Sequence, residues 1–68
     1  MLIKIGDIRF NSNKITVYHS EAKSSIMINT VDGKYYPIGF KSSAERDSAL
    51  QQLDEDMSQN GFSEIKVN

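Results

Sequence analysis

Cysteine and tryptophan are absent from this 68-residue sequence, and histidine and proline each occur once. Without cysteine, neither a disulfide nor a thiolate-bound metal can stabilise the chain. The single histidine, His19, cannot build a multi-histidine zinc site. A chain of about 60 residues buries only roughly 60% of the surface that it exposes when unfolded. We therefore expect stability to come from a tightly packed core or from association with another subunit.

Long apolar segments are also absent. The apolar stretch at the N-terminus is interrupted by Lys4, and it lacks the apolar region of roughly 7–15 residues found in secretory signal peptides. No segment approaches the ~20 apolar residues of a membrane-spanning helix. The lack of cysteine is typical of proteins in a reducing compartment. The sequence therefore predicts a cytoplasmic protein that is not associated with a membrane.

Charge is unevenly distributed, although the net charge is only −1. Residues 1–41 contain six basic and three acidic side chains, which gives a net charge of +3. Residues 42–68 contain two basic and six acidic side chains, which gives −4. Such an asymmetry either orients a charged partner or reflects two ordinary solvated faces, and the sequence leaves both interpretations open.

Apolar residues that alternate with polar ones predict an antiparallel β-meander over residues 1–41. Between the first two alternating stretches, Gly6-Asp7 indicates either a tight turn or a bulge within one longer strand. The next predicted strand, residues 14–19, places Ile15 and Val17 on the core side and Tyr18 on the opposite side. A further strand over residues 25–30 then follows a polar loop.

Asp32-Gly33 predicts a hairpin, and the apolar pattern selects its register. A two-residue turn would place Ile26 and Ile28 on the opposite face from Tyr36 and Ile38, whereas a three-residue loop over residues 31–33 aligns all four. Gly33 then occupies the left-handed position that closes a type I turn with a bulge. We expect the three-residue loop, and Pro37 indicates that the last strand of the meander lies at an edge.

The sequence predicts an amphipathic helix over residues 42–60. Ser42 and Glu45 have the spacing of a capping box, and apolar residues then recur at helical intervals. Asn60-Gly61 indicates the end of the helix, with a predicted contact between Met57 and Phe62. We expect residues 61–68 to add a short terminal strand or to remain a tail. The apolar helix positions are Ala49, Leu50, Leu53 and Met57.

One helix packed across one face of a three- to five-stranded sheet is a two-layer α+β fold, and we expect residues 1–68 to form a single small domain of this class. The predicted core contains eleven residues from the strands and three from the helix. They are Ile3, Ile5, Ile8, Phe10, Ile15, Val17, Ile26, Ile28, Tyr36, Ile38, Phe40, Leu50, Leu53 and Met57. The opposite face of the sheet stays uncovered in a monomer.

Few residues have the chemistry that catalysis requires. His19 and Ser20 are adjacent in a predicted strand, so their side chains point to opposite faces and do not form a catalytic pair. Asp54, Glu55 and Asp56 lie within the predicted helix rather than in a calcium-binding loop. No glycine-rich phosphate-binding loop is present. The sequence therefore predicts a protein without enzymatic activity, cofactor or metal.

The uncovered sheet face is the main candidate for binding another protein. Tyr18, Met27, Tyr35 and Pro37 are predicted to share this face and to form an apolar patch. The acidic residues Asp54, Glu55 and Asp56 offer a second surface for a basic partner. The same patch, or the edge strand, is an alternative route to a homodimer. A single-stranded nucleic acid that stacks on Tyr18 and Tyr35 is the other alternative, although the chain is not basic.

The chain resembles the small accessory proteins of low-GC bacteria and their phages. The resemblance rests on its length, on a composition rich in Ile, Lys, Asn and Ser, on a strand that starts at Met1, and on the hairpin sequence Asp32-Gly33-Lys34-Tyr35-Tyr36. It covers the whole chain in general character and includes no diagnostic motif. It implies a regulator or inhibitor that acts stoichiometrically on a host or defence protein.

Overall fold

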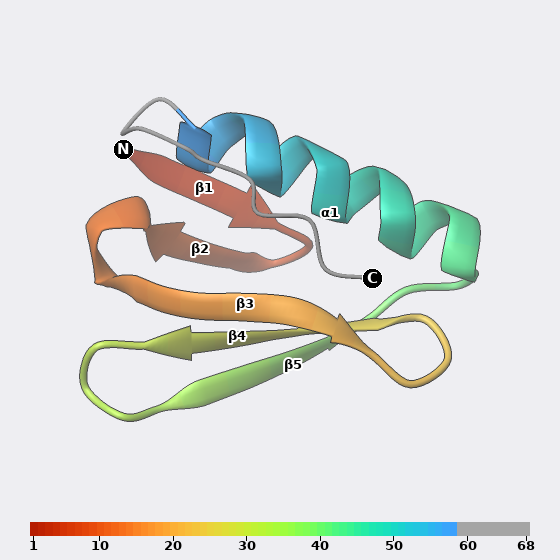
Figure 1. Ribbon diagram of the computed structural model, residues 1–68, viewed down its shortest axis with the longest axis horizontal. Coiled ribbons are helices and arrows are strands. Elements are labelled where there is room, and N and C mark those ends of the chain that lie inside the picture. The colour runs from red at the N-terminus through yellow and green to blue at the C-terminus, as the bar shows by residue number, and fades with distance from the viewer. Residues whose placement is uncertain (59–68) are drawn as a thin grey trace, which may run out of the picture.

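A computed structural model describes residues 1–58, which form an α+β fold (Figure 1). Two antiparallel sheets, one of two strands and one of three, precede a single α-helix that packs against them. The elements in chain order are β1 (Leu2–Ile5), β2 (Ile8–Asn11), the 3₁₀ helix η1 (Ser12–Lys14), β3 (Ile15–Glu21), β4 (Ser25–Thr30), β5 (Tyr35–Gly39) and α1 (Ser43–Ser58).

Strands β1 and β2 form a hairpin whose two-residue turn is Gly6-Asp7. Ile5 pairs with Ile8, so this segment is a tight turn between two strands and not a bulge within one. Gly6 has φ +60° at the first central position, while Asp7 has a negative φ. This pattern is that of a type II′ turn, whose twist matches the twist of the strands that it joins.

The second sheet has the strand order β3-β4-β5. The predicted three-residue loop is confirmed, because Ile28 pairs with Tyr36 and Ile26 pairs with Ile38. Gly33 adopts φ +84° and donates its N–H to the Thr30 carbonyl oxygen at 3.0 Å. Within residues 1–58, β5 lies at an edge of its sheet, as the single proline indicated.

Strand β3 contains a bulge between Ile15 and Val17, and this bulge overturns part of the predicted face assignment. The extra residue reverses the side on which all following side chains point. Val17 therefore lies on the outer face and is 51% exposed, contrary to its predicted place in the core. Tyr18, opposite Ile28, points inward instead of outward. Thr16, at the bulge, donates its hydroxyl to the Asn29 carbonyl oxygen at 3.2 Å.

The helix begins where the sequence predicted, because the Ser42 hydroxyl accepts the Glu45 backbone N–H at 3.2 Å. This bond satisfies one of the N–H groups that have no partner within the first turn of a helix. Arg46 then attaches the helix to the β3–β4 hairpin, donating to the carbonyl oxygens of Glu21 at 3.0 Å and Ser25 at 3.3 Å. The predicted helix end at Asn60-Gly61 and the terminal strand or tail over 61–68 lie outside the described residues.

The core lies between the β1–β2 hairpin, the inner face of the β3–β5 sheet and the helix. Phe10 of β2 meets Tyr36 of β5 edge to face, with ring centroids 5.3 Å apart, so the hairpin packs over the larger sheet. The predicted core is largely confirmed, but Ile8 is 38% exposed. Buried hydrophobic residues are Ile3, Ile5, Phe10, Ile15, Ile26, Ile28 and Leu53. Among residues 1–58, no helix is long and apolar enough to cross a bilayer.

Candidate functional site

The outer face of the β3–β5 sheet, on the side away from the core, carries a group of apolar side chains. The register places Val17, Asn29 and Tyr35 in one row across the three strands, and His19, Met27 and Pro37 in the next. Tyr35 is 68% exposed and Val17 is 51% exposed. We call this surface the outer patch, and it consists of Val17, His19, Met27, Tyr35 and Pro37.

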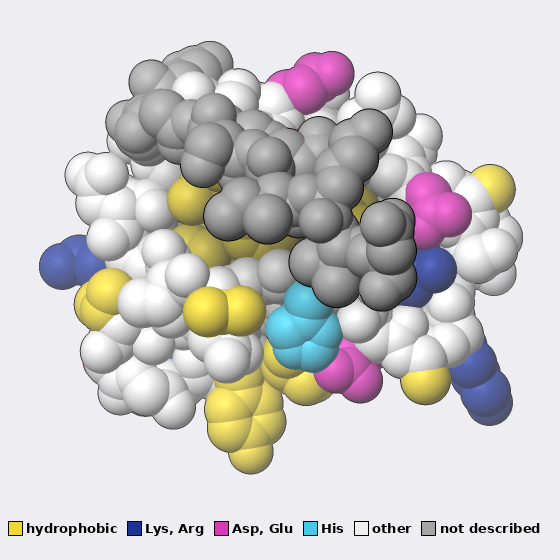
Figure 2. Space-filling model, viewed as in Figure 1, with side chains coloured by type: hydrophobic (Ala, Val, Ile, Leu, Met, Phe, Trp, Pro, Cys, Tyr) yellow, Lys and Arg dark blue, Asp and Glu magenta, His cyan; other side chains and the backbone are white. Residues whose placement is uncertain are grey.

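The outer patch surrounds one polar residue, because Asn29 lies between Val17 and Tyr35 on the central strand. In Figure 2 hydrophobic side chains border the single histidine over the lower part of the molecule, where Figure 1 places β3, β4 and β5. The His19 Nδ1 atom lies 3.4 Å from a Glu21 carboxylate oxygen and 3.0 Å from the Ser20 carbonyl oxygen. Protein-binding surfaces commonly combine aromatic and methionine side chains with polar groups in this way.

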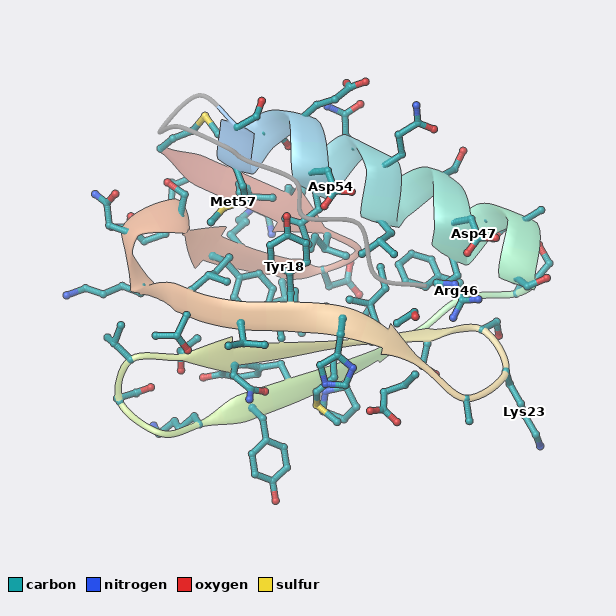
Figure 3. The ribbon with its side chains drawn as sticks, in the orientation of Figure 1. Tyr18, Lys23, Arg46, Asp47, Asp54 and Met57 are labelled. Atoms are coloured by element: carbon teal, nitrogen blue, oxygen red, sulfur yellow. The ribbon has the colours of Figure 1, made fainter. Side chains whose placement is uncertain are left out.

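Tyr18, which the sequence assigned to this patch, lies on the other side of the sheet. Its hydroxyl donates a hydrogen bond to the Asp54 carboxylate of α1 at 2.7 Å (Figure 3). Burial, this hydrogen bond and the nearby negative charge together raise the pKa of Tyr18 well above its ordinary value. Tyr18 thus connects the sheet to the helix and is not available as an exposed anchor.

The three consecutive acids of α1 have different surroundings. Asp54 is half-buried and accepts the hydrogen bond from Tyr18. Asp56 accepts a hydrogen bond from the Gln52 side-chain amide at 3.1 Å, one turn earlier on the helix. Only Glu55 of the three is exposed. Consecutive helix residues point about 100° apart, so the three carboxylates project in different directions, and their role as an acidic docking surface stays a prediction.

Pro37 has a second role at the free edge of β5. The hydrogen bonds from Thr30 N–H to the Lys34 carbonyl oxygen and from Phe40 N–H to the Ser24 carbonyl oxygen show that even-numbered residues of β5 face β4. Backbone groups of odd-numbered residues then point outward. Pro37 is one of these, and it has no N–H to offer. The position of this proline weakens the edge as a template for another strand, including β5 of a second copy.

Val17 and His19 belong to the outer patch although sequence reasoning did not place them there. The alternation of Ile15, Thr16, Val17 and Tyr18 fits either face equally well, because all four residues are common in strands. Only the bulge decides between the two faces, and the sequence contains no glycine at this point that would have indicated it. Met27, Tyr35 and Pro37 lie on the outer face as predicted.

Comparison with known proteins supplies no family for this chain. No protein-family model matches the sequence, and neither a curated protein nor a solved structure shows detectable similarity to it.

Proposed function

We propose that this protein is a non-enzymatic binding module that regulates or inhibits another protein by contacting it through the outer patch. The observation that carries this proposal is the row of His19, Met27 and Pro37 beside Val17 and Tyr35 on a sheet face that no other described element covers. Contiguous exposed apolar groups with a polar border are typical of protein-binding surfaces. Tyr and Met are enriched in such interfaces.

The inward position of Tyr18 favours a protein partner over a single-stranded nucleic acid. Base stacking along a strand requires successive exposed aromatic rings and cations that follow the backbone. On the outer face of the described sheet, Tyr35 and His19 are the exposed aromatic rings, they lie on different strands and in different rows, and the acidic Glu21 borders the patch beside His19. Exposed apolar side chains next to a carboxylate are better suited to a protein surface than to a phosphate backbone.

A face-to-face contact also fits the outer patch better than strand pairing. Pro37 removes a donor from the β5 edge, whereas its ring and the side chains of Met27 and Tyr35 add apolar area to the face. A partner that rests on these side chains needs no hydrogen bond from the edge. Stoichiometric binding of this kind, in which one small protein covers a functional surface of another, is the mode of action that we propose for a regulator or inhibitor.

The experiment that tests this proposal is affinity enrichment from lysate of the source organism, with and without nuclease, using wild type and two variants. Met27→Glu places a charge at the centre of the outer patch. Gln51→Glu adds the same charge on the exposed side of α1 and is the matched control. Thermal unfolding of both variants is compared first, so that loss of binding is interpreted only for folded protein.

The proposal predicts a near-stoichiometric protein partner that resists nuclease, is retained by Gln51→Glu and is lost with Met27→Glu. Purified partner and wild type should then form a complex of defined stoichiometry, and the partner's activity should change on binding. Equal recovery with both variants would remove the outer patch from the interface. Recovery that disappears on nuclease treatment would favour the nucleic-acid alternative, and recovery of additional copies of the bait alone would favour a homo-oligomer.

A further inference from the structure

Strand β2 has a free edge, and the hairpin register identifies the backbone groups on it. Ile5 pairs with Ile8 across the two-residue turn, and Ser12 N–H donates to the Met1 carbonyl oxygen at 2.9 Å. In an antiparallel ladder, hydrogen-bonded and non-hydrogen-bonded pairs alternate. Arg9 and Asn11 therefore occupy non-hydrogen-bonded positions, and their backbone N–H and C=O groups point away from β1. Within residues 1–58 no strand pairs with this edge.

The free edge of β2 opens on a groove of about 440 Å³. The groove lies between β2 and the loop that joins β4 to β5, and Arg9 and Asn11 line one side of it. Apolar side chains of Ile8, Val31 and Tyr36 line it as well, with Val31 56% exposed. A free strand edge beside an apolar groove is the arrangement by which sheets accept an extended peptide as an additional strand.

Charge around the groove favours an acidic occupant. Arg9 and Lys14 both line it, and neither forms an ion pair with a carboxylate of residues 1–58. The only acidic side chain among the lining residues is Asp32. Its carboxylate accepts the Thr30 hydroxyl and, at 3.4 Å, the Lys34 backbone N–H, so it is occupied within its own loop.

We propose that this groove binds an extended, acidic segment of a partner protein, which adds as a strand to the β2 edge at Arg9 and Asn11. Side chains on an added strand alternate between the two faces. Residues opposite Arg9 and Asn11 lie on the same face as the Arg9 guanidinium and are acidic. Residues opposite Ile8 and Phe10 face the apolar side of the groove. The recognised segment therefore alternates acidic and apolar residues.

The three other outer strands lack this combination. Pro37 interrupts the outward-facing donors of β5, the bulge between Ile15 and Val17 interrupts the start of β3, and β1 contributes no residue to the groove. Among the described residues, the β2 edge combines the 440 Å³ groove with two cations that form no ion pair, although the Arg9 guanidinium also donates to the Asp7 carbonyl oxygen at 3.2 Å. The β2 groove is separate from the outer patch, so it does not depend on the function proposed for that patch.

The probe that tests this inference is the peptide acetyl-Ser-Val-Glu-Val-Glu-Val-Ser-amide, titrated into ¹⁵N-labelled protein and followed by amide chemical shifts. Two control peptides accompany it. The first replaces both Glu residues with Lys and reverses the charge. The second is N-methylated at the two Glu residues, which retains the side chains but removes the backbone donors that would pair with β2.

Asn11 offers a matched pair of variants on the protein. Its φ of −84° is close to the angle that proline imposes, and its N–H points outward, so Asn11→Pro removes a donor from the edge without breaking the hairpin. Asn11→Ala keeps the N–H and, like Asn11→Pro, removes the side-chain oxygen that caps Asn13 at 3.1 Å. A difference between these variants therefore reports the change at the backbone nitrogen, where Asn11→Pro replaces the outward N–H with a ring carbon.

We expect the acidic peptide to shift the amide signals of Arg9, Asn11 and Val31, with binding that weakens as salt increases. Asn11→Pro should bind roughly five- to tenfold more weakly than Asn11→Ala. The Lys-containing and N-methylated peptides should bind more weakly than the acidic one by similar factors. The inference is overturned if the N-methylated peptide binds equally well, if the two Asn11 variants are indistinguishable, or if millimolar peptide shifts only outer-patch signals such as Met27.

Discussion

At the scale of single residues, Tyr18 and Asp54 make the contact that most clearly links the two layers of the fold. The 2.7 Å hydrogen bond joins the middle of β3 to the C-terminal half of α1 in a partly buried environment. A hydrogen bond to a charged acceptor contributes more than one between neutral groups. Removing the phenol hydroxyl also takes away the one side-chain donor that Asp54 has among the described residues.

We expect Tyr18→Phe to lower the free energy of unfolding by about 1–2 kcal/mol at neutral pH, because the hydrogen bond is part-buried and not fully shielded. Tyr35→Phe is the control, since Tyr35 is 68% exposed and has no hydroxyl partner among the described residues. Urea denaturation of the two variants and the wild type gives both differences. Equal stability of Tyr18→Phe and Tyr35→Phe would show that the Tyr18–Asp54 contact contributes nothing.

The same contact predicts an alkaline limit to stability. The pKa of Tyr18 is raised in the folded state, so the unfolded chain loses this proton at a lower pH than the folded protein. The contribution of Tyr18 is therefore complete below the ordinary tyrosine pKa of 10.0 and is lost as the pH rises above it. The stability difference between wild type and Tyr18→Phe should shrink above pH 10, and a difference that stays constant there would contradict the assignment.

Asp32 predicts the opposite pH dependence at the β4–β5 loop. Hydrogen bonds from the Thr30 hydroxyl and the Lys34 N–H lower the pKa of the Asp32 carboxyl below its ordinary 3.8. Its stabilising contribution is thus present above that pH and is lost as the pH falls through the lowered pKa. Asp32→Asn should reduce the melting temperature at pH 7 more than Asp7→Asn does. The excess should disappear in strongly acidic solution, and a pH-independent excess would exclude this cause.

At the scale of elements, turns and helix ends could be predicted from the sequence where neighbouring residues allow only one backbone conformation. The three-residue loop closed by Gly33 follows from the apolar pattern of β4 and β5, since a one-residue slip would separate Ile26 and Ile28 from their partners. The start of α1 follows from Ser42 and Glu45 in the same way. Both predictions depend on residues that are close in the chain.

The face assignment of β3 could not be predicted because it depends on a bulge. The residues from Ile15 to Tyr18 suit either face of a strand, so propensity does not choose between them. The choice is made by contacts distant in sequence, namely the Thr16 bond to Asn29 and the Tyr18 bond to Asp54. Three residues of the outer patch were therefore predicted, while Val17 and His19 were missed and Tyr18 was wrongly included.

Replacing Pro37 with a residue that has a backbone N–H should make the free edge of β5 more prone to self-association. Pro37→Val supplies an outward N–H and a side chain that favours strands, so we expect more concentration-dependent self-association than in the wild type. Tyr35→Val is the control, because it places the same side chain on the same face without changing the number of donors. Sedimentation velocity over a concentration series measures the effect. If both variants associate equally, the proline does not protect this edge.

At the scale of the whole molecule, the helix is held to the strands at several points along its length. Near the start of the helix, Arg46 donates hydrogen bonds to the β3–β4 hairpin. Nearer the end of the helix, Leu53 packs in the core and Asp54 accepts a hydrogen bond from β3. Leu53 is the one helix residue that is fully buried among those described, with 1% exposure. Since the hairpin and the sheet meet beneath it, this single side chain fills space between all three parts of the fold.

Leu53→Ala should therefore bring the protein close to global unfolding. Truncating a buried leucine costs about 2–5 kcal/mol, because transfer energy is lost and a cavity remains. A chain of 68 residues has a total stability of roughly 3–10 kcal/mol. Leu50→Ala is the matched control, since Leu50 is only half-buried on the same helix and its truncation leaves a site that water can reach.

Circular dichroism during urea denaturation measures the stability of the two leucine variants. Partner binding by the same samples then shows whether the outer patch depends on an intact core. The patch is formed by three strands whose inner faces pack against the hairpin and helix, so its register requires an intact core. Leu53→Ala should consequently lose partner binding in proportion to its unfolded fraction, although Leu53 is not part of the patch. Leu50→Ala should retain most of the binding. If Leu53→Ala is as stable as Leu50→Ala, then Leu53 does not fill the centre of the core.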